Sequence, residues 1–140
     1  MKPLDLSKSF NKFVQIIIAD TIRGIRRGSQ FSDSFKPNED STVIQKKHDR
    51  PLIGKGQNGV WLNKSKYKVE KATETKQSAS VEIPNAEIAL INQTSKTHAR
   101  PFWGVSKNAV DKMNKDVNSD ITKYLKQVDK VLIEQGFKKV

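Results

Sequence analysis

The side chains that most often carry chemistry are scarce in this sequence. It has no cysteine, and its two histidines, His48 and His98, both stand in polar runs that are typical of exposed positions. Disulfides, thiolate zinc sites and cysteine nucleophiles are therefore excluded. No Ser-His-Asp order and no pair of shielded carboxylates stands out either. We expect no enzyme activity, no metal and no cofactor.

One glycine pattern could serve phosphate chemistry. Residues 54–59, GKGQNG, match G-x-G-x-x-G, which binds a pyrophosphate when it follows a strand and opens a helix. Here the pattern precedes residues 60–62, VWL, which are strand-like. A kinase glycine loop does lie between strands, but the catalytic aspartate motif and Asp-Phe-Gly are absent, and 140 residues are too few for that fold. The pattern therefore indicates a loop before a hairpin.

Length and charge bound the remaining possibilities. A chain of 140 residues, 35% hydrophobic and 29% charged, can bury a core without disulfides, and we expect one domain over 1–140. Its 26 Lys and Arg against 15 Asp and Glu give a net charge of +11. The longest apolar run, residues 13–19, is too short for a membrane span, and the N-terminus shows no signal-peptide pattern. We expect a protein made in a cytoplasm, with no membrane partner.

The positive charge is spread along the chain rather than gathered in a tail. Its densest clusters define a candidate basic contact patch of Arg23, Arg26, Arg27, Lys64, Lys66 and Lys68. Such a patch is either a solvated face or a surface for phosphates or an acidic partner, where bound Lys and Arg release counterions. Few aromatic residues lie nearby, which disfavours base stacking on single strands.

Hydrophobic periodicity predicts a helix at each end of the chain. Apolar residues recur at three- and four-residue steps over 5–27, which predicts an amphipathic helix within residues 1–28 that stops at Gly28. Its stripe suits either a core face or an anionic membrane surface. The same period over 106–136 predicts one long C-terminal helix, capped by Ser106 and stopped by Gly136.

The middle of the chain predicts the β part of an α+β fold. Residues 29–58 indicate a loop that contains a short helix near 41–47. Residues 59–93 then alternate with a period of two and predict an antiparallel sheet of three or four strands, with a free hairpin tip at 73–78. The last apolar run, 88–91, could instead begin a short helix.

The least random stretch runs from His98 to Ser106. An Arg-Pro pair fixes an extended approach, two aromatics follow, and a glycine bend leads to the helix cap. The residues singled out are Arg100, Phe102 and Trp103. They either anchor the start of the last helix or form a subunit interface, where Arg and Trp are enriched.

The order of these motifs resembles the phage virion morphogenesis proteins, which are the Mu-type and P2-type tail completion proteins and, more distantly, siphophage tail-joining proteins. The resemblance covers about residues 40–125. It is carried by the short helix at 41–47, the PLIGKG entry at 51–56, the apolar run and Asn-Gln at 88–93 and, above all, ARPFWGVS at 99–106. The sequence departs from the family around 88–95, where Tyr-Ala is replaced by Ile-Ala.

The resemblance implies a structural virion protein of the neck or tail end, which completes the tail and joins it to the head. It implies a homo-oligomeric ring, commonly of six subunits, around the DNA path, with neighbouring neck, connector and tail-tube proteins as partners and possible non-specific DNA contact. The alternative is a basic nucleic-acid-binding module, and a small antitoxin-like partner protein also fits the size. A ring would multiply the +11 charge, so acidic neighbours, DNA or the chain's own acids must offset it.

Overall fold

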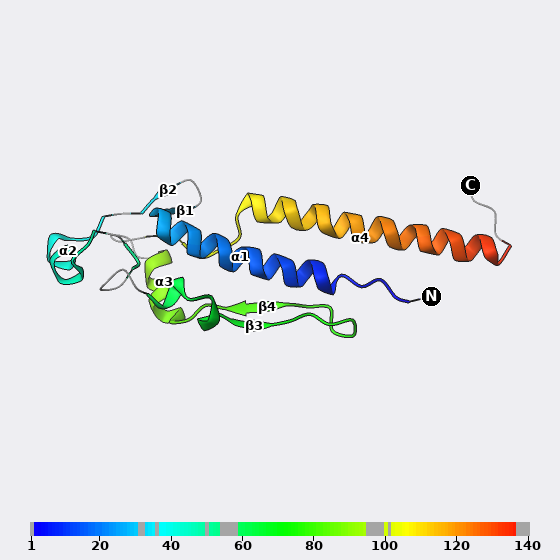
Figure 1. The fold of residues 1–140 in the computed structure, drawn as a ribbon, viewed down its shortest axis with the longest axis horizontal. Helices are drawn as coiled ribbons and strands as arrows, with labels where there is room; N and C mark the ends of the chain where they lie inside the picture. The colour runs from blue at the N-terminus through cyan, green and yellow to red at the C-terminus, as the bar shows by residue number, and fades with distance from the viewer. Residues whose placement is uncertain are drawn as a thin grey trace.

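A single helix organises the fold. In the computed structural model, which describes residues 2–30, 33–35, 37–49, 51–53, 59–94, 100 and 102–136, α1 (Ser7–Arg27) lies between a β-hairpin and α4 (Lys107–Glu134). Figure 1 shows that α1 and α4 run antiparallel, that the molecule is elongated, and that α4 extends well past the start of α1. The glycine pattern at 54–58, and residues 95–99 and 101 of the family-like stretch, fall outside the described residues.

The predicted N-terminal helix is confirmed, and its apolar stripe is a core face. Val14, Ile18 and Ile25 are buried in the main hydrophobic cluster. The helix ends at Gly28, whose φ of 77° lets its N–H reach the carbonyl of Gly24 at 3.0 Å. Because this stripe is already covered by the chain, it does not serve as a membrane-facing surface.

The β part is smaller than the sequence predicts. β3 (Lys68–Glu70) pairs antiparallel with β4 (Ser80–Glu82), and a second ladder joins the two-residue strands β1 (Ser29–Gln30) and β2 (Asp33–Ser34). The α+β class and the antiparallel pairing are confirmed, but the expectation of three or four strands in one sheet over 59–93 was wrong.

Two of the expected strands are helical instead. Val60–Leu62 forms the 3₁₀ turn η2, in which the N–H of Leu62 donates to the carbonyl of Gly59 at 3.1 Å. The indole of Trp61 donates to the carbonyl of Pro84 at 2.7 Å, and the Trp61 carbonyl accepts from the Tyr67 hydroxyl at 2.7 Å. The run at 88–91, for which a short helix was the alternative, lies within α3 (Ala86–Thr94). Short apolar runs do not distinguish a strand from a helix by period alone.

The hairpin is fastened to the start of α1. The side chain of Asn11 accepts from the backbone N–H of Ala72 at 2.7 Å and donates to its carbonyl at 3.0 Å. Near the tip, Gln77 accepts from the N–H of Leu6 at 2.8 Å and donates to the carbonyl of Leu4 at 2.7 Å. The tip expected to be free is therefore held against the N-terminal segment.

The two remaining helices form where the sequence predicts them but bury little. α2 (Asp40–Lys46) buries no residue, and the side chain of Ile44 is 76% exposed. α4 is one unbroken helix capped by Ser106, as predicted, yet its one buried residue is Ala109. None of the described helices combines the length and the apolar character needed to cross a membrane.

Candidate functional site

The residues singled out near Arg100 form a junction between α3, α4 and the core. Phe102 is fully buried, and its ring centroid lies 4.6 Å from that of Trp61. Trp103 is half-buried and lies against Tyr67, with ring centroids 5.8 Å apart. Tilted pairs of this kind add to the energy of simple burial. Phe102 thus anchors the fold, and Trp103 forms its outer edge.

A glutamine that sequence reasoning did not single out holds this junction together. The Gln93 side chain accepts from the N–H of Phe102 at 2.6 Å and from the N–H of Trp103 at 3.2 Å. Its amide also donates to the carbonyl of Trp103 at 2.7 Å. One side chain at the end of α3 therefore satisfies three backbone groups ahead of α4. The sequence signal that could have identified Gln93 was its position in residues 88–93, the apolar run and Asn-Gln that carry part of the family resemblance.

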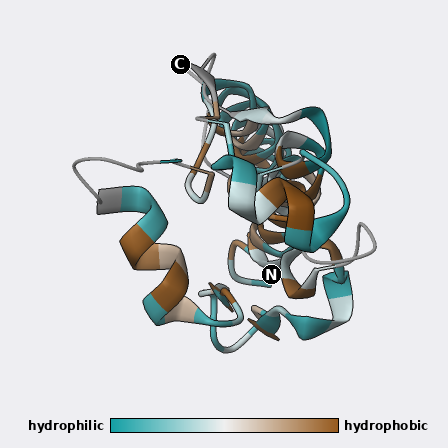
Figure 2. Cartoon of the chain, turned by 90° about the vertical axis from the view of Figure 1, so that its left-hand side faces the viewer, coloured by the Kyte–Doolittle hydropathy of each residue, from teal (hydrophilic) through white to brown (hydrophobic). Residues whose placement is uncertain are grey.

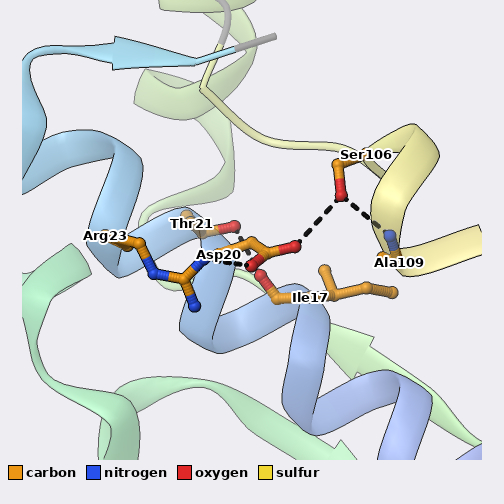
Figure 3. Close-up of polar contacts among 6 residues, drawn as sticks. All are labelled: Ile17, Asp20, Thr21, Arg23, Ser106 and Ala109. Carbon is orange, nitrogen blue, oxygen red and sulfur yellow. Dashed lines mark hydrogen bonds and ion pairs between the residues drawn. The ribbon is translucent and has the colours of Figure 1, made fainter. Parts of the chain in front are cut away.

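The start of α4 is tied to the middle of α1 by a polar relay (Figure 3). Ser106 Oγ accepts from the N–H of Ala109 at 3.1 Å and donates to Asp20 Oδ2 at 3.0 Å. The other oxygen of Asp20 lies 3.0 Å from Arg23. Arg23, a member of the candidate basic patch, is therefore engaged within its own helix.

Nearer the N-terminus of α1, polar contacts between α1 and α4 fix how far the two helices overlap. Lys12 lies 3.4 Å from Asp116, and Ser9 Oγ donates to Asp120 Oδ2 at 2.5 Å. Because α1 begins at Ser7, this register places residues 124–134 of α4 beyond the end of its partner helix, as Figure 1 shows.

Arg100 connects the junction to the segment before α2. Its guanidinium donates to the carbonyl of Pro37 at 3.0 Å, and its backbone N–H donates to the carbonyl of Asn92 at 2.6 Å. Burial lowers the pKa of Arg100. Burial, and then the charge of Arg100, lowers the pKa of Lys46 at the end of α2. Arg100 thus has a structural role within the chain.

The structure brings three of the six basic-patch residues together. Arg26 from α1 and Lys64 and Lys66 from η3 (Lys64–Lys66) line one open hollow of about 690 Å³, whose other lining residues are Gly59, Val60, Leu62 and Asn63. A second hollow of about 460 Å³ shares Lys64 and is also bordered by Lys12 and Lys71. Among the residues that the structure describes, no acidic side chain lines either hollow. We call Arg26, Lys64, Lys66 and Lys71 the basic strip.

The other members of the patch lie elsewhere. Arg27 donates to Ser29 Oγ at 3.1 Å, and Lys68 lies exposed on β3. The sequence placed Arg26, Lys64 and Lys66 in one patch, and these three line the same hollow. It could not show that Lys12 and Lys71 border a neighbouring hollow, because that depends on how α1 packs against the hairpin.

Large aliphatic side chains remain exposed on two helices. On α3, Ile88, Leu90 and Ile91 are all more than half exposed. Figure 2 shows hydrophobic residues along this helix, whose ribbon lies to one side of the chain. On α4, Leu125 is 54% and Ile133 53% exposed. Apolar surface gathered in this way on a helix marks interaction sites more often than isolated exposed residues do.

Among the described residues, no group of three His, Asp or Glu side chains could hold a metal ion. Burial raises the pKa of Tyr67, whose hydroxyl is bound to the Trp61 carbonyl. No protein-family model, no curated protein and no solved structure matches the chain.

Proposed function

We propose that this chain is a structural, non-catalytic subunit of the neck or tail end of a phage virion. It completes the tail and joins it to the head as part of a homo-oligomeric ring around the DNA path. Its partners are copies of itself and the adjoining connector and tail-tube proteins, and its location is the virion.

The observation that carries the assembly part of this proposal is the uncovered apolar surface on α3 and α4. A monomer leaves Ile88, Leu90 and Ile91 in water on one helix and Leu125 and Ile133 on another. Assembly would bury them, and burial of apolar surface is the main favourable term in protein association. The assignment to a phage neck is supported by the residues of ARPFWGVS, which resemble the tail completion proteins.

Electron microscopy of particles made without this protein tests the assignment. We expect filled heads and separate tails that do not join, and joining restored when the protein is supplied. Normal head–tail joining in its absence would contradict the proposal. A chain of +11 must meet acidic surfaces, in its neighbours or in other copies, to offset its charge on assembly. We therefore also expect ring formation or docking to weaken at high salt, where these attractive contacts are screened.

The basic strip favours a second candidate function, a module that binds nucleic acid through its phosphates. Arg26, Lys64 and Lys66 are all exposed around one hollow, which none of the described acidic residues lines. Titration with duplex DNA at two salt concentrations tests this candidate. Micromolar or tighter binding at physiological salt with a steep salt slope would favour it, and a Lys64→Glu/Lys66→Glu variant should then lose the binding.

A further inference from the structure

The outward face of α1 is almost entirely cationic. Apart from Ala19, every exposed side chain of this helix belongs to a lysine or an arginine: Lys8, Lys12, Arg23, Arg26 and Arg27. With 3.6 residues per turn, all of these cations except Arg27 fall within about a sixth of a turn of one another, so they form one row along the helix. At 1.5 Å per residue, the row from Lys8 to Arg26 is about 27 Å long.

Lysines of the basic strip flank this row on the side where α1 meets the hairpin (Figure 1). Lys64 and Lys66 share the hollow of about 690 Å³ with Arg26, and Lys64 also lines the hollow of about 460 Å³ with Lys12 and Lys71. Lys64 therefore links the two ends of the row. The basic strip, Lys8, Lys12 and Arg23 together form one surface, which we call the basic track.

Two acidic side chains pair with cations of the basic track, and each is less exposed than its partner. The side chain of Asp20 is 17% exposed, against 63% for Arg23. The side chain of Asp116 on α4 is 29% exposed, against 54% for Lys12. An approaching anion therefore meets the cations before the acids. Within the described part of the chain, no ion pair engages the lysines that the hairpin side contributes: Lys64, Lys66 and Lys71.

The hairpin turns its own acids away from the basic track. Val69 lines the hollow of about 460 Å³, and successive side chains of a strand point to opposite faces of the sheet. Lys68 and Glu70 on β3 therefore lie on the far face, as does Glu82, which stands opposite Lys68 in the ladder. The face of the hairpin that borders α1 carries Lys71 instead.

The composition of the basic track favours a nucleic-acid duplex over other anionic partners. Protein interfaces have a centre that is depleted in charge, whereas the exposed side chains of α1 are nearly all cations. The apolar stripe of α1 is buried, so this helix has no apolar face to insert into an anionic bilayer. Trp61 and Tyr67, which flank η3 in the sequence, are buried and cannot stack on unpaired bases. A duplex requires neither insertion nor stacking.

We propose that the basic track binds the phosphate backbone of duplex DNA, with α1 lying along it. A row of about 27 Å spans about eight base pairs at 3.4 Å each. Lysine and arginine contacts to phosphates position a protein without reading its sequence, so this binding is non-specific. The inference rests on the second candidate function and extends it from one hollow to the outward face of α1. In the proposed ring, the same face turns toward the DNA path.

Fluorescence anisotropy of the full chain with a labelled DNA duplex longer than the track, measured over a range of salt concentrations, tests this assignment. Wild type is compared with Lys8→Gln/Lys12→Gln, which neutralises the end of the track away from the larger hollow, and with Lys64→Gln/Lys66→Gln at that hollow. All four side chains are exposed, and circular dichroism confirms that each variant is folded.

The matched control is Lys68→Gln/Lys107→Gln, which removes two exposed charges away from the basic track. Lys68 lies on the far face of the hairpin. Lys107 lies about half a turn around α4 from Lys123, which lines a hollow of about 230 Å³ with Lys8 and Lys12.

We expect each track pair to weaken duplex binding by about tenfold or more. Each should also reduce the slope of log affinity against log salt by about two, since each lost phosphate contact removes about one. The control should bind like wild type. Single-stranded DNA of the same length, and vesicles of phosphatidylserine and phosphatidylcholine, should bind wild type more weakly than the duplex does.

Four results would overturn the proposal. Binding lost in Lys64→Gln/Lys66→Gln but unchanged in Lys8→Gln/Lys12→Gln would leave the second candidate function standing without the track. A control that loses as much binding as the track pairs would show that net charge alone matters. Wild type that does not bind the duplex would contradict the track and the second candidate function together. Tighter binding to single strands or vesicles would assign the face to that partner. The head–tail joining assay is scored independently of all four.

Discussion

The two long helices carry similar amphipathic patterns but serve different purposes. α1 buries eight residues, among them Val14, Ile18 and Ile25, between the hairpin and α4. α4 is longer and buries only Ala109. An apolar stripe shows that a helix has a face to cover but does not show what covers it. In α1 the cover is the chain itself, and in α4 we infer that much of it is another molecule.

The largest expected effect is a loss of stability that occurs on truncating a core residue but not on truncating an exposed residue of α4. Phe102→Ala removes a fully buried ring stacked on Trp61 and should lower the free energy of unfolding by about 3–5 kcal/mol. Leu125→Ala, its counterpart on the exposed edge of α4, should change it by no more than about 0.5 kcal/mol. Urea denaturation of dilute protein measures both. A loss of several kcal/mol in Leu125→Ala would mean that α4 is covered within the monomer.

A smaller loss is expected at the junction between the two regions. Gln93→Ala leaves the N–H groups of Phe102 and Trp103 without their partner, which should cost about 1–3 kcal/mol. Gln127→Ala removes the same side chain from an exposed position on α4 and should be nearly silent. Equal stability of the two variants would contradict the inference that the Gln93 side chain holds the junction together. The comparison is made by thermal or urea unfolding.

The sequence predicted this junction as an anchor but did not predict its partners. ARPFWGVS identified the place, and Ser106 was correctly expected to cap α4. Gln93 and Asp20 could not be paired with it, because their contacts depend on how α3 and α1 pack. The helices at both ends were also predictable, since long periodic patterns are robust, whereas residues 60–62 and 88–91 were too short for their period to distinguish strand from helix.

The helix cap gives the third effect. Ser106→Ala removes both the bond to the Ala109 N–H and the bond to Asp20, and should cost about 1 kcal/mol. Ser119→Ala, in the exposed middle of α4, is the matched control and should be neutral or slightly stabilising, because alanine favours helices. A Ser106→Ala variant as stable as the control would show that the relay to α1 contributes nothing.

The smallest effect is the pH dependence that Tyr67 gives to the stability of the core. Burial raises the pKa of Tyr67, so its contribution to stability is complete below the unfolded value of about 10 and is lost progressively above it, as the unfolded state ionises. By about pH 10.5 the loss should be just under about 1 kcal/mol. Tyr67→Phe should remove this loss, so that the variant keeps more of its stability above pH 10 than wild type does, whereas Tyr124→Phe on α4 should lose stability as wild type does. An unchanged loss in Tyr67→Phe would contradict the assignment.

Native-state hydrogen exchange at several protein concentrations tests the contrast between the helices most directly. The account predicts that the amides of α1 are protected at every concentration, while those of residues 124–134 become protected only as concentration rises at low salt. Protection of 124–134 that is independent of concentration, or absent throughout, would contradict the claim that a second copy covers this end of α4.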